Sequence, residues 1–317
     1  MKYFHNMIHL ALRKQTCVYS LDQSTIKDIM GNLLMLLPNL KKLTHLKIGY
    51  SFVKIFGWES ALSFVENSLN LRQLEAHIYT NINKTSEIRE RINNVIIGHL
   101  ALTKLTIHQG DDLWIDLSSC RNLTHFTFRL YNRMDNSKYE QLCALLDNNL
   151  NLEMLNIDNV SHSNLQLIGK LMKLPKLKTL CLEICPFDAD FHEDLPCHRN
   201  IKDLHFVSLQ NIEVCCGKFE NHAKFVAFLL ARSPLLKEFS LKALYSNLTF
   251  YHTLFEEFAL YDQIETFRIH GRLPHGIKLF IYNEISKMMN LNYFWLHSPN
   301  FCVDDVQKVC ELTNLKL

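Results

Sequence analysis

The sequence predicts an α/β solenoid with a parallel inner sheet of about 11 strands and helices on its outer side, forming a single domain over residues 1–317. The main observation is a phrase with apolar residues at its first, fourth and sixth positions, which recurs about a dozen times. Clear copies span residues 43–48, 123–128 and 177–182. A phrase that returns at short intervals is the sequence signature of stacked structural repeats. Such an array grows by addition of units and needs no single central core.

The second observation is the spacing of these phrases, whose first positions lie 21 to 36 residues apart. They are Met7, Leu43, Leu71, Leu102, Leu123, Leu152, Leu177, Ile201, Leu236, Ile264 and Leu291, with a clipped twelfth copy at Leu312 or Leu315. Between phrases the apolar period changes from two to about 3.6, which indicates helices. Helices are expected over 24–36, 59–69, 86–97, 165–172, 254–261, 277–289 and 303–310, and around 139–146 and 225–230. One strand followed by one helix is the pattern of a leucine-rich repeat.

The third observation is the residues that separate helix from strand. Asparagine stands directly before the phrase at Asn6, Asn70, Asn122, Asn151, Asn200 and Asn290. Because asparagine tolerates a left-handed backbone, these positions are expected to be tight turns. Two segments fit the repeat poorly: residues 185–198 are expected to form a loop or a short helical turn, and residues 207–218 an irregular linker.

Bulk composition limits the classes of partner. The chain has 34 basic and 32 acidic residues, a net charge of +2, so no nucleic-acid or membrane partner is expected. Its longest purely apolar run, residues 33–37, is far too short to span a membrane. The ten cysteines are scattered, as in a reducing cytoplasmic or nuclear compartment, and Cys181 is expected in the core.

Known catalytic patterns are missing from the sequence. It contains no glycine-rich phosphate loop, no nucleophile elbow and no Cys-x-x-Cys pair. An open array of repeats also seldom supplies the pocket that an enzyme needs. We therefore expect a non-enzymatic protein without a cofactor or a metal site.

The candidate binding surface is the inner face of the sheet, formed by the residues between and just after the apolar positions. In the first five repeats it is basic and rich in histidine, and it carries His9, Arg13, His45, Lys47, His77, Lys104, His108, His125 and Arg129, with Glu75 as the one acid. In the middle it is acidic, with Asp158, Glu183, Asp203 and Glu238, and Lys242 at the edge. The last two repeats carry Arg268, His270, Tyr293, Trp295 and His297.

Histidine is over-represented on this face, because eight of the 16 histidines fall on its 33 positions. Three interpretations stay open: the imidazoles fill space on a flat sheet, they bind a partner in a pH-sensitive way, or neighbours converge on a metal ion. The metal interpretation is the weakest, because no carboxylate or cysteine repeats beside them in register. Tyr293 and Trp295 are either interface anchors or packing for whatever closes the array.

The phrase Asn-Leu-x-x-Leu-x-Leu, with copies at Asn70, Asn122, Asn151 and Asn290, resembles the leucine-rich region of F-box proteins over essentially the whole chain. The resemblance implies a substrate-recognition subunit or scaffold of SCF-type ubiquitin ligation and proteasomal degradation, with a protein partner on the concave face. The F-box itself is not seen ahead of Met7, so a Skp-type adaptor is expected only if a box precedes Met1 in a longer product. The alternative is a box-less binding or enzyme-inhibitor protein, similar to ribonuclease inhibitor, with no ligase role.

Overall fold

A computed structural model describes part of the chain: residues 9–12, 28, 31–32, 35, 41–78, 85–99, 101–109, 117–118, 120–130, 136–161, 164–184, 204–217, 220–243, 247–258, 263–271, 273, 275–298, 305 and 307–308. The chain divides into two compact units, Met1–Leu152 and Glu153–Leu317. The single domain expected from the sequence stays a prediction.

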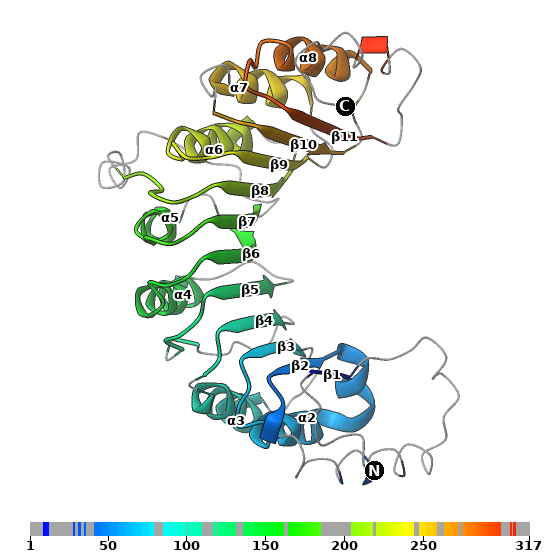
Figure 1. The fold of residues 1–317 in the computed structure, drawn as a ribbon, viewed down its shortest axis with the longest axis vertical. Helices are drawn as coiled ribbons and strands as arrows, with labels where there is room; N and C mark the ends of the chain where they lie inside the picture. The colour runs from blue at the N-terminus through cyan, green and yellow to red at the C-terminus, as the bar shows by residue number, and fades with distance from the viewer. Residues whose placement is uncertain are drawn as a thin grey trace. The chain divides into compact units, whose positions relative to one another are not determined.

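The N-terminal unit contains five parallel strands that pair in sequence order (Figure 1). They are β1 (His9–Leu12), β2 (His45–Ile48), β3 (Gln73–Ile78), β4 (Lys104–Gln109) and β5 (His125–Leu130). The helices described in this unit are α2 (Tyr50–Glu66), α3 (Thr85–Gly98) and α4 (Asn136–Asn148).

The C-terminal unit repeats the same arrangement, with α6, α7 and α8 alongside β8 to β11 (Figure 1). Its parallel strands are β6 (Met154–Val160), β7 (Thr179–Ile184), β8 (Asn211–Cys216), β9 (Glu238–Ala243), β10 (Thr266–His270) and β11 (Tyr293–His297). Its helices are α5 (Leu165–Met172), α6 (Glu220–Ala231), α7 (Leu248–Phe258) and α8 (His275–Ile285). With five strands in one unit and six in the other, the described residues hold 11 strands, and the α/β leucine-rich repeat solenoid is confirmed.

The apolar phrase forms the core of each repeat. Along β7, Leu180, Leu182 and Ile184 are buried and alternate with partly exposed residues, as a strand with period two requires. The leucine at the first position of the phrase is also buried, as at Leu71 and Leu152. Burial of a leucine side chain contributes about 1.5–3 kcal/mol, so each phrase supplies several kcal/mol to its repeat.

A buried polar residue closes the helix three positions before several phrases. Asn149 accepts a hydrogen bond from the Leu123 amide at 2.8 Å through Oδ1, and its Nδ2 donates to the carbonyls of Cys120 and Leu145 at 2.6 and 2.8 Å. At the same place in other repeats, the hydroxyls of Ser68 and Ser233 donate to carbonyls four residues earlier. Asn149 thereby joins two successive repeats of the N-terminal unit.

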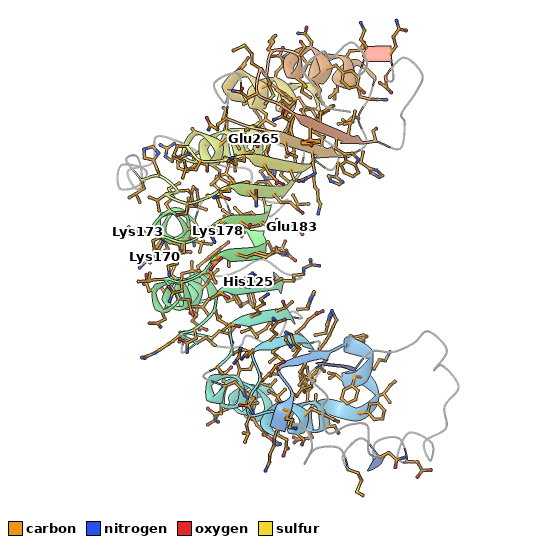
Figure 2. The ribbon with its side chains drawn as sticks, in the orientation of Figure 1. His125, Lys170, Lys173, Lys178, Glu183 and Glu265 are labelled. Atoms are coloured by element: carbon orange, nitrogen blue, oxygen red, sulfur yellow. The ribbon has the colours of Figure 1, made fainter. Side chains whose placement is uncertain are left out.

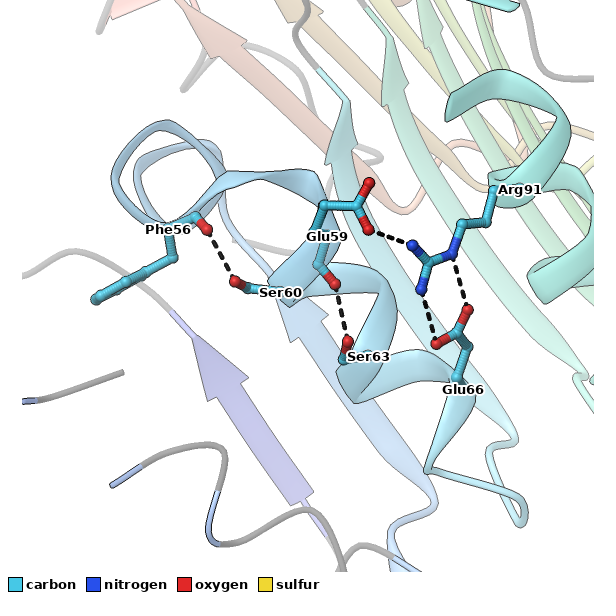
Figure 3. Close-up of polar contacts among 6 residues, drawn as sticks. All are labelled: Phe56, Glu59, Ser60, Ser63, Glu66 and Arg91. Carbon is cyan, nitrogen blue, oxygen red and sulfur yellow. Dashed lines mark hydrogen bonds and ion pairs between the residues drawn. The ribbon is translucent and has the colours of Figure 1, made fainter. Parts of the chain in front are cut away.

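The two neighbouring helices α2 and α3 are linked by an arginine fork (Figure 3). Arg91 of α3 donates to both carboxylate oxygens of Glu66 at 3.1 and 3.2 Å, and a further nitrogen donates to Glu59. The hydrogen bond to Glu66 is the main reason why the pKa of Arg91 is raised. Because these groups are largely exposed, the pairs contribute at most about 1 kcal/mol each.

The eighth strand was predicted from the wrong phrase. The phrase beginning at Ile201 does not form it, since residues 204–206 are not in a strand, and the segment expected to be an irregular linker provides β8 instead. Leu209, Ile212 and Val214 also match the phrase, and Gln210 and Asn211 donate their amides to the Lys178 carbonyl. Pairing with β7 and β9 therefore selected the second of two equally periodic phrases.

The observed bounds of the helices agree to different degrees with those predicted from the sequence. Helix α5 has the predicted bounds, because Asn164 caps it by accepting the Leu167 amide at 3.0 Å. Helix α2 consists of two helical stretches separated by a kink at Gly57, whose φ of 78° and ψ of 165° are not helical; the helix predicted from residue 59 corresponds to the second stretch, and the stretch that begins at Tyr50 was not predicted. Helix α7 begins earlier than predicted, and α8 ends earlier. The expected loop at 185–198 and the twelfth phrase lie outside the described residues.

The asparagines before the phrases lie in turns at Asn70, Asn151 and Asn290, as predicted, but not through a left-handed backbone. Asn70, Asn122, Asn151 and Asn290 have no left-handed backbone, and among the described non-glycine residues only Asn159, at a bulge in β6, has a positive φ. Asn70 instead donates its side-chain amide to the Lys41 carbonyl, close to the preceding strand. In this turn asparagine therefore acts as a hydrogen-bond donor between repeats. Within the described ranges, no helix has the length and apolar character needed to cross a membrane.

Candidate functional site

The candidate site is the inner face of each sheet, the side whose residues alternate with the buried ones. In the N-terminal unit the strand register aligns these residues in three rows. The rows are His45, Gln73, Lys104 and His125; then Lys47, Glu75, Thr106 and Thr127; then His77, His108 and Arg129. The predicted basic, histidine-rich surface therefore lies on one face of β2 to β5, with Glu75 as its carboxylate among the described residues.

The most compact group on this face consists of four side chains from three adjacent strands. Lys47 of β2 forms an ion pair with Glu75 of β3. The Oε1 of Glu75 lies 3.4 Å from Nε2 of His77, two residues further along the same strand. The ring of His77 stacks on His108 of β4, with centroids 3.9 Å apart and planes 6° from parallel. We call Glu75, His77 and His108 the His–Glu cluster.

The electrostatics of the His–Glu cluster favour a neutral His108. Burial, as the main cause, and the nearby His77, Arg129 and Lys47 together lower the pKa of His108 to about 4. At neutral pH this imidazole therefore keeps a lone pair on one ring nitrogen. Such a nitrogen can accept a hydrogen bond or bind a metal.

Two other histidines are fixed locally by a repeated Thr-His pair. The hydroxyl of Thr44 lies 2.7 Å from Nδ1 of His45, and that of Thr124 lies 2.9 Å from Nδ1 of His125. His125 lies beside β5 in Figure 2. At these two positions the local hydrogen bonding agrees with the interpretation that the imidazoles fill space on the sheet.

The inner face of the C-terminal unit carries charges that pair across strands. Lys242 of β9 pairs with Glu213 of β8, and Arg268 of β10 binds Glu238 of β9 at 3.0 Å. The hydrogen bond to Glu213 raises the pKa of Lys242. Glu183 lies towards the carboxyl end of β7 in Figure 2, opposite Cys215 in the register.

Two cysteines lie on this face. Cys181 alternates with buried Leu180 and Leu182 and is partly exposed, so the predicted core position was wrong. Burial, as the main cause, and the neighbouring Glu183 help to raise the pKa of Cys215 to about 11. A thiol with such a pKa is a poor nucleophile at neutral pH, so Cys215 lacks the usual activation of a catalytic cysteine.

The last described strand presents aromatic side chains. Tyr293 and Trp295 of β11 are 57% and 46% exposed. The ring of Trp295 lies 4.4 Å from His270 and 5.5 Å from His297, centroid to centroid. Burial is the main cause of the lowered pKa of His270. These rings form an accessible aromatic patch, which we define as His270, Tyr293, Trp295 and His297.

Most predicted site residues lie on the inner face, but three need comment. The backbone of His9 pairs in register with His45, whereas Arg13 and Asp203 lie outside the described residues. Because β8 is Asn211–Cys216, its inner-face residues are Asn211, Glu213 and Cys215. Glu213 was missed for this reason, although the phrase at 209–214 was a usable signal. His205, one of the eight histidines assigned to the face, is not in a strand.

A cavity of about 440 Å³ lies elsewhere in the C-terminal unit. Its lining comes from the turns before the strands and includes Pro234, Leu235 and Gln263. None of the predicted site residues lines it.

No protein-family model matches the chain, and comparison with curated proteins gives no match. Two solved structures are similar in fold. One is a protein from Bacteroides fragilis, 15% identical, with a TM-score of 0.44 over 87% of this chain and 72% of that chain. The other is the leucine-rich repeat-containing protein LegL7 from Legionella pneumophila, 14% identical, with a TM-score of 0.43 over 96% of this chain and 89% of that chain. At such TM-scores neither likeness carries an argument, and the fold rests on the strand order and register.

Proposed function

We propose that this protein is a non-catalytic interaction module that holds a protein partner on the inner face of its sheets. The observation that carries the proposal is the aromatic patch, with Trp295 46% exposed and Tyr293 57% exposed on the same face of β11. Exposed tryptophan and tyrosine are the residues that most often dominate the energy of protein interfaces. They offer large contact areas with little conformational entropy to lose.

The charged residues of the inner face have a different role in this proposal from the aromatic patch. Lys242 and Arg268 already have carboxylate partners within the sheet, so a ligand that binds them must compete with Glu213 or Glu238. Such charges set orientation, association rate and salt dependence more than affinity. We expect the basic face of β2 to β5 to bind an acidic segment of the partner.

The finer role follows from the resemblance of the Asn-Leu phrase to F-box proteins: a substrate-recognition subunit or scaffold in ubiquitin ligation. Its test is separate. Recovery of a Skp-type adaptor with the chain expressed from its complete gene supports this role. Failure to recover the adaptor leaves a binding module without a ligase, such as an enzyme inhibitor.

The binding proposal is tested by affinity capture from cell extract with wild-type protein and Trp295→Ala, followed by mass spectrometry. We expect proteins retained by the wild type to fall at least tenfold with the variant, because interface anchors contribute about 2 kcal/mol or more. Met289→Ala is the matched control, since Met289 is 72% exposed in the same unit but lies off the inner face. Equal capture by Trp295→Ala and wild type would reject the aromatic patch as the anchor.

A further inference from the structure

All three side chains of the His–Glu cluster lie close together. Neither the ion pair between Lys47 and Glu75 nor the stack of His77 on His108 requires this. Glu75 and His77 are two residues apart on β3, so both point to the inner face, and His108 is the register partner of His77 on β4. One donor atom from each of the three side chains can be chosen so that all lie within 4.8 Å of one another. Two hydrogen-bonded strands therefore fix the backbone of all three residues.

The spacing of these donors is close to that of a metal site. Zinc binds histidine nitrogen and carboxylate oxygen at about 2.0–2.2 Å, which places two ligand atoms of a tetrahedral site about 3.4 Å apart. Nε2 of His77 and Oε1 of Glu75 are already separated by 3.4 Å. All donor pairs lie within 4.8 Å, so the remaining distances have to shorten by at most about 1.4 Å. Because the lone pair of an imidazole nitrogen lies in the ring plane and the two rings are only 6° from parallel, one ring also has to turn out of the stack to bind the same ion.

The donor set selects the class of ion. Two imidazoles with one carboxylate suit borderline divalent ions such as Zn²⁺, Co²⁺, Ni²⁺ and Cu²⁺, whereas Ca²⁺ and Mg²⁺ prefer oxygen ligands throughout. Glu75 and His77 have side chains only 28% and 24% exposed, so water competes weakly for them. Since the inner face is open, a fourth position is left for water or for a side chain of a partner.

Two positively charged side chains oppose metal binding by the His–Glu cluster. Lys47 forms an ion pair with Glu75, and Arg129 lies near enough to His108 to affect its charge. A divalent ion has to displace the ammonium group of Lys47 from the carboxylate. Lys47 is therefore a built-in competitor, and its removal has a predictable effect on metal affinity.

We propose that Glu75, His77 and His108 form a binding site for a divalent ion of the zinc class on the inner face of the N-terminal unit. The site lies on the same inner face as the proposed partner-binding surface, but metal binding to it can be measured without a partner. It departs from the sequence-based expectation of no metal site, which rested on the lack of a carboxylate or cysteine that repeats beside the histidines in register; the single carboxylate of Glu75 lies beside His77 through the i, i+2 spacing on one strand.

The test is titration of the full chain with Zn²⁺ by calorimetry at pH 7.5 under reducing conditions, with Co²⁺ absorption as a report of the ligand field. We expect one ion per chain, and a loss of affinity of at least tenfold in each of Glu75→Gln, His77→Gln and His108→Gln, since each removes one of three ligands. Lys47→Gln should raise the affinity several-fold. This increase separates a metal site from a purely structural ion pair.

The matched control is His125→Gln, which removes an inner-face histidine of β5 that is not in the cluster. It should leave Zn²⁺ affinity and the Co²⁺ spectrum unchanged, and circular dichroism should show that all variants are folded. Wild-type affinity in all three ligand variants would overturn the proposal, because the ion would then bind elsewhere. Absence of stoichiometric binding to the wild type, or lower affinity in Lys47→Gln, would overturn it as well.

Discussion

The imidazoles of His77 and His108 stack face to face, with centroids 3.9 Å apart and planes 6° from parallel. Two positive rings at this separation would repel each other, and Lys47 and Arg129 add to the positive potential around them. The stack therefore requires at least one neutral ring. His108, whose pKa is lowered to about 4 with burial as the main cause, fills that requirement.

This stack makes the stability of the N-terminal unit depend on pH. The pKa of His108 is about 4 in the folded chain, against 6.5 for an unperturbed histidine. Between these values the unfolded chain binds more protons, so the free energy of unfolding is unaffected above pH 6.5 and decreases as the pH falls towards 4. We expect His108 to contribute a loss of about 2 kcal/mol between pH 7.5 and pH 4.5.

Urea unfolding of wild type and His108→Gln at both pH values measures this contribution. His99 and His270 also have lowered pKa values and give both proteins a common slope, so the difference between the two proteins isolates His108. An identical pH dependence in wild type and variant would contradict the assignment.

A buried ion pair in the C-terminal unit gives a second prediction. Lys278 of α8 pairs with Asp305, and their side chains are only 2% and 0% exposed. Asp305→Ala leaves a buried ammonium group without its carboxylate, so we expect a loss of about 3–5 kcal/mol in urea unfolding. The exposed pair Lys237–Glu265 is the matched control, and Glu265→Gln should cost at most about 1 kcal/mol. Equal losses at the two sites would show that Asp305 is not buried as described.

Asn149 provides a third prediction. Asn149→Ala removes the acceptor of the Leu123 amide and the donor to two carbonyls, all in the interior of the N-terminal unit. A buried amide without an acceptor costs about 1–3 kcal/mol, so the free energy of unfolding should fall by about 3 kcal/mol. Asn149→Ser, which introduces the residue found at Ser68 and Ser233, should lose less. A loss below about 1 kcal/mol in the alanine variant would contradict the bridging role.

The sequence predicted what depends on local spacing. The bounds of α5 followed from the apolar period, and the inner-face residues followed from alternation around each phrase. What it missed depends on contacts between repeats. Two phrases competed for β8, and only hydrogen bonds to neighbouring strands decide between them. Likewise, Glu75 and His108 were both identified, but the distance between their donors depends on how β3 pairs with β4.

Gly271 shows how closely the repeats approach each other after β10. A Cβ atom added at this position would lie 2.4 Å from the carbonyl oxygen of Ala243, a backbone atom that cannot simply rotate away. The Gly271 amide also donates to the His297 carbonyl at 3.0 Å, which holds it between two neighbouring strands. Gly271→Ala should therefore lower the free energy of unfolding by about 1–3 kcal/mol, as overpacking does. Gly276→Ala, in α8 with open space around it, should instead be neutral or raise stability by up to about 1 kcal/mol. Equal effects of the two substitutions in urea unfolding would contradict the close approach at Gly271.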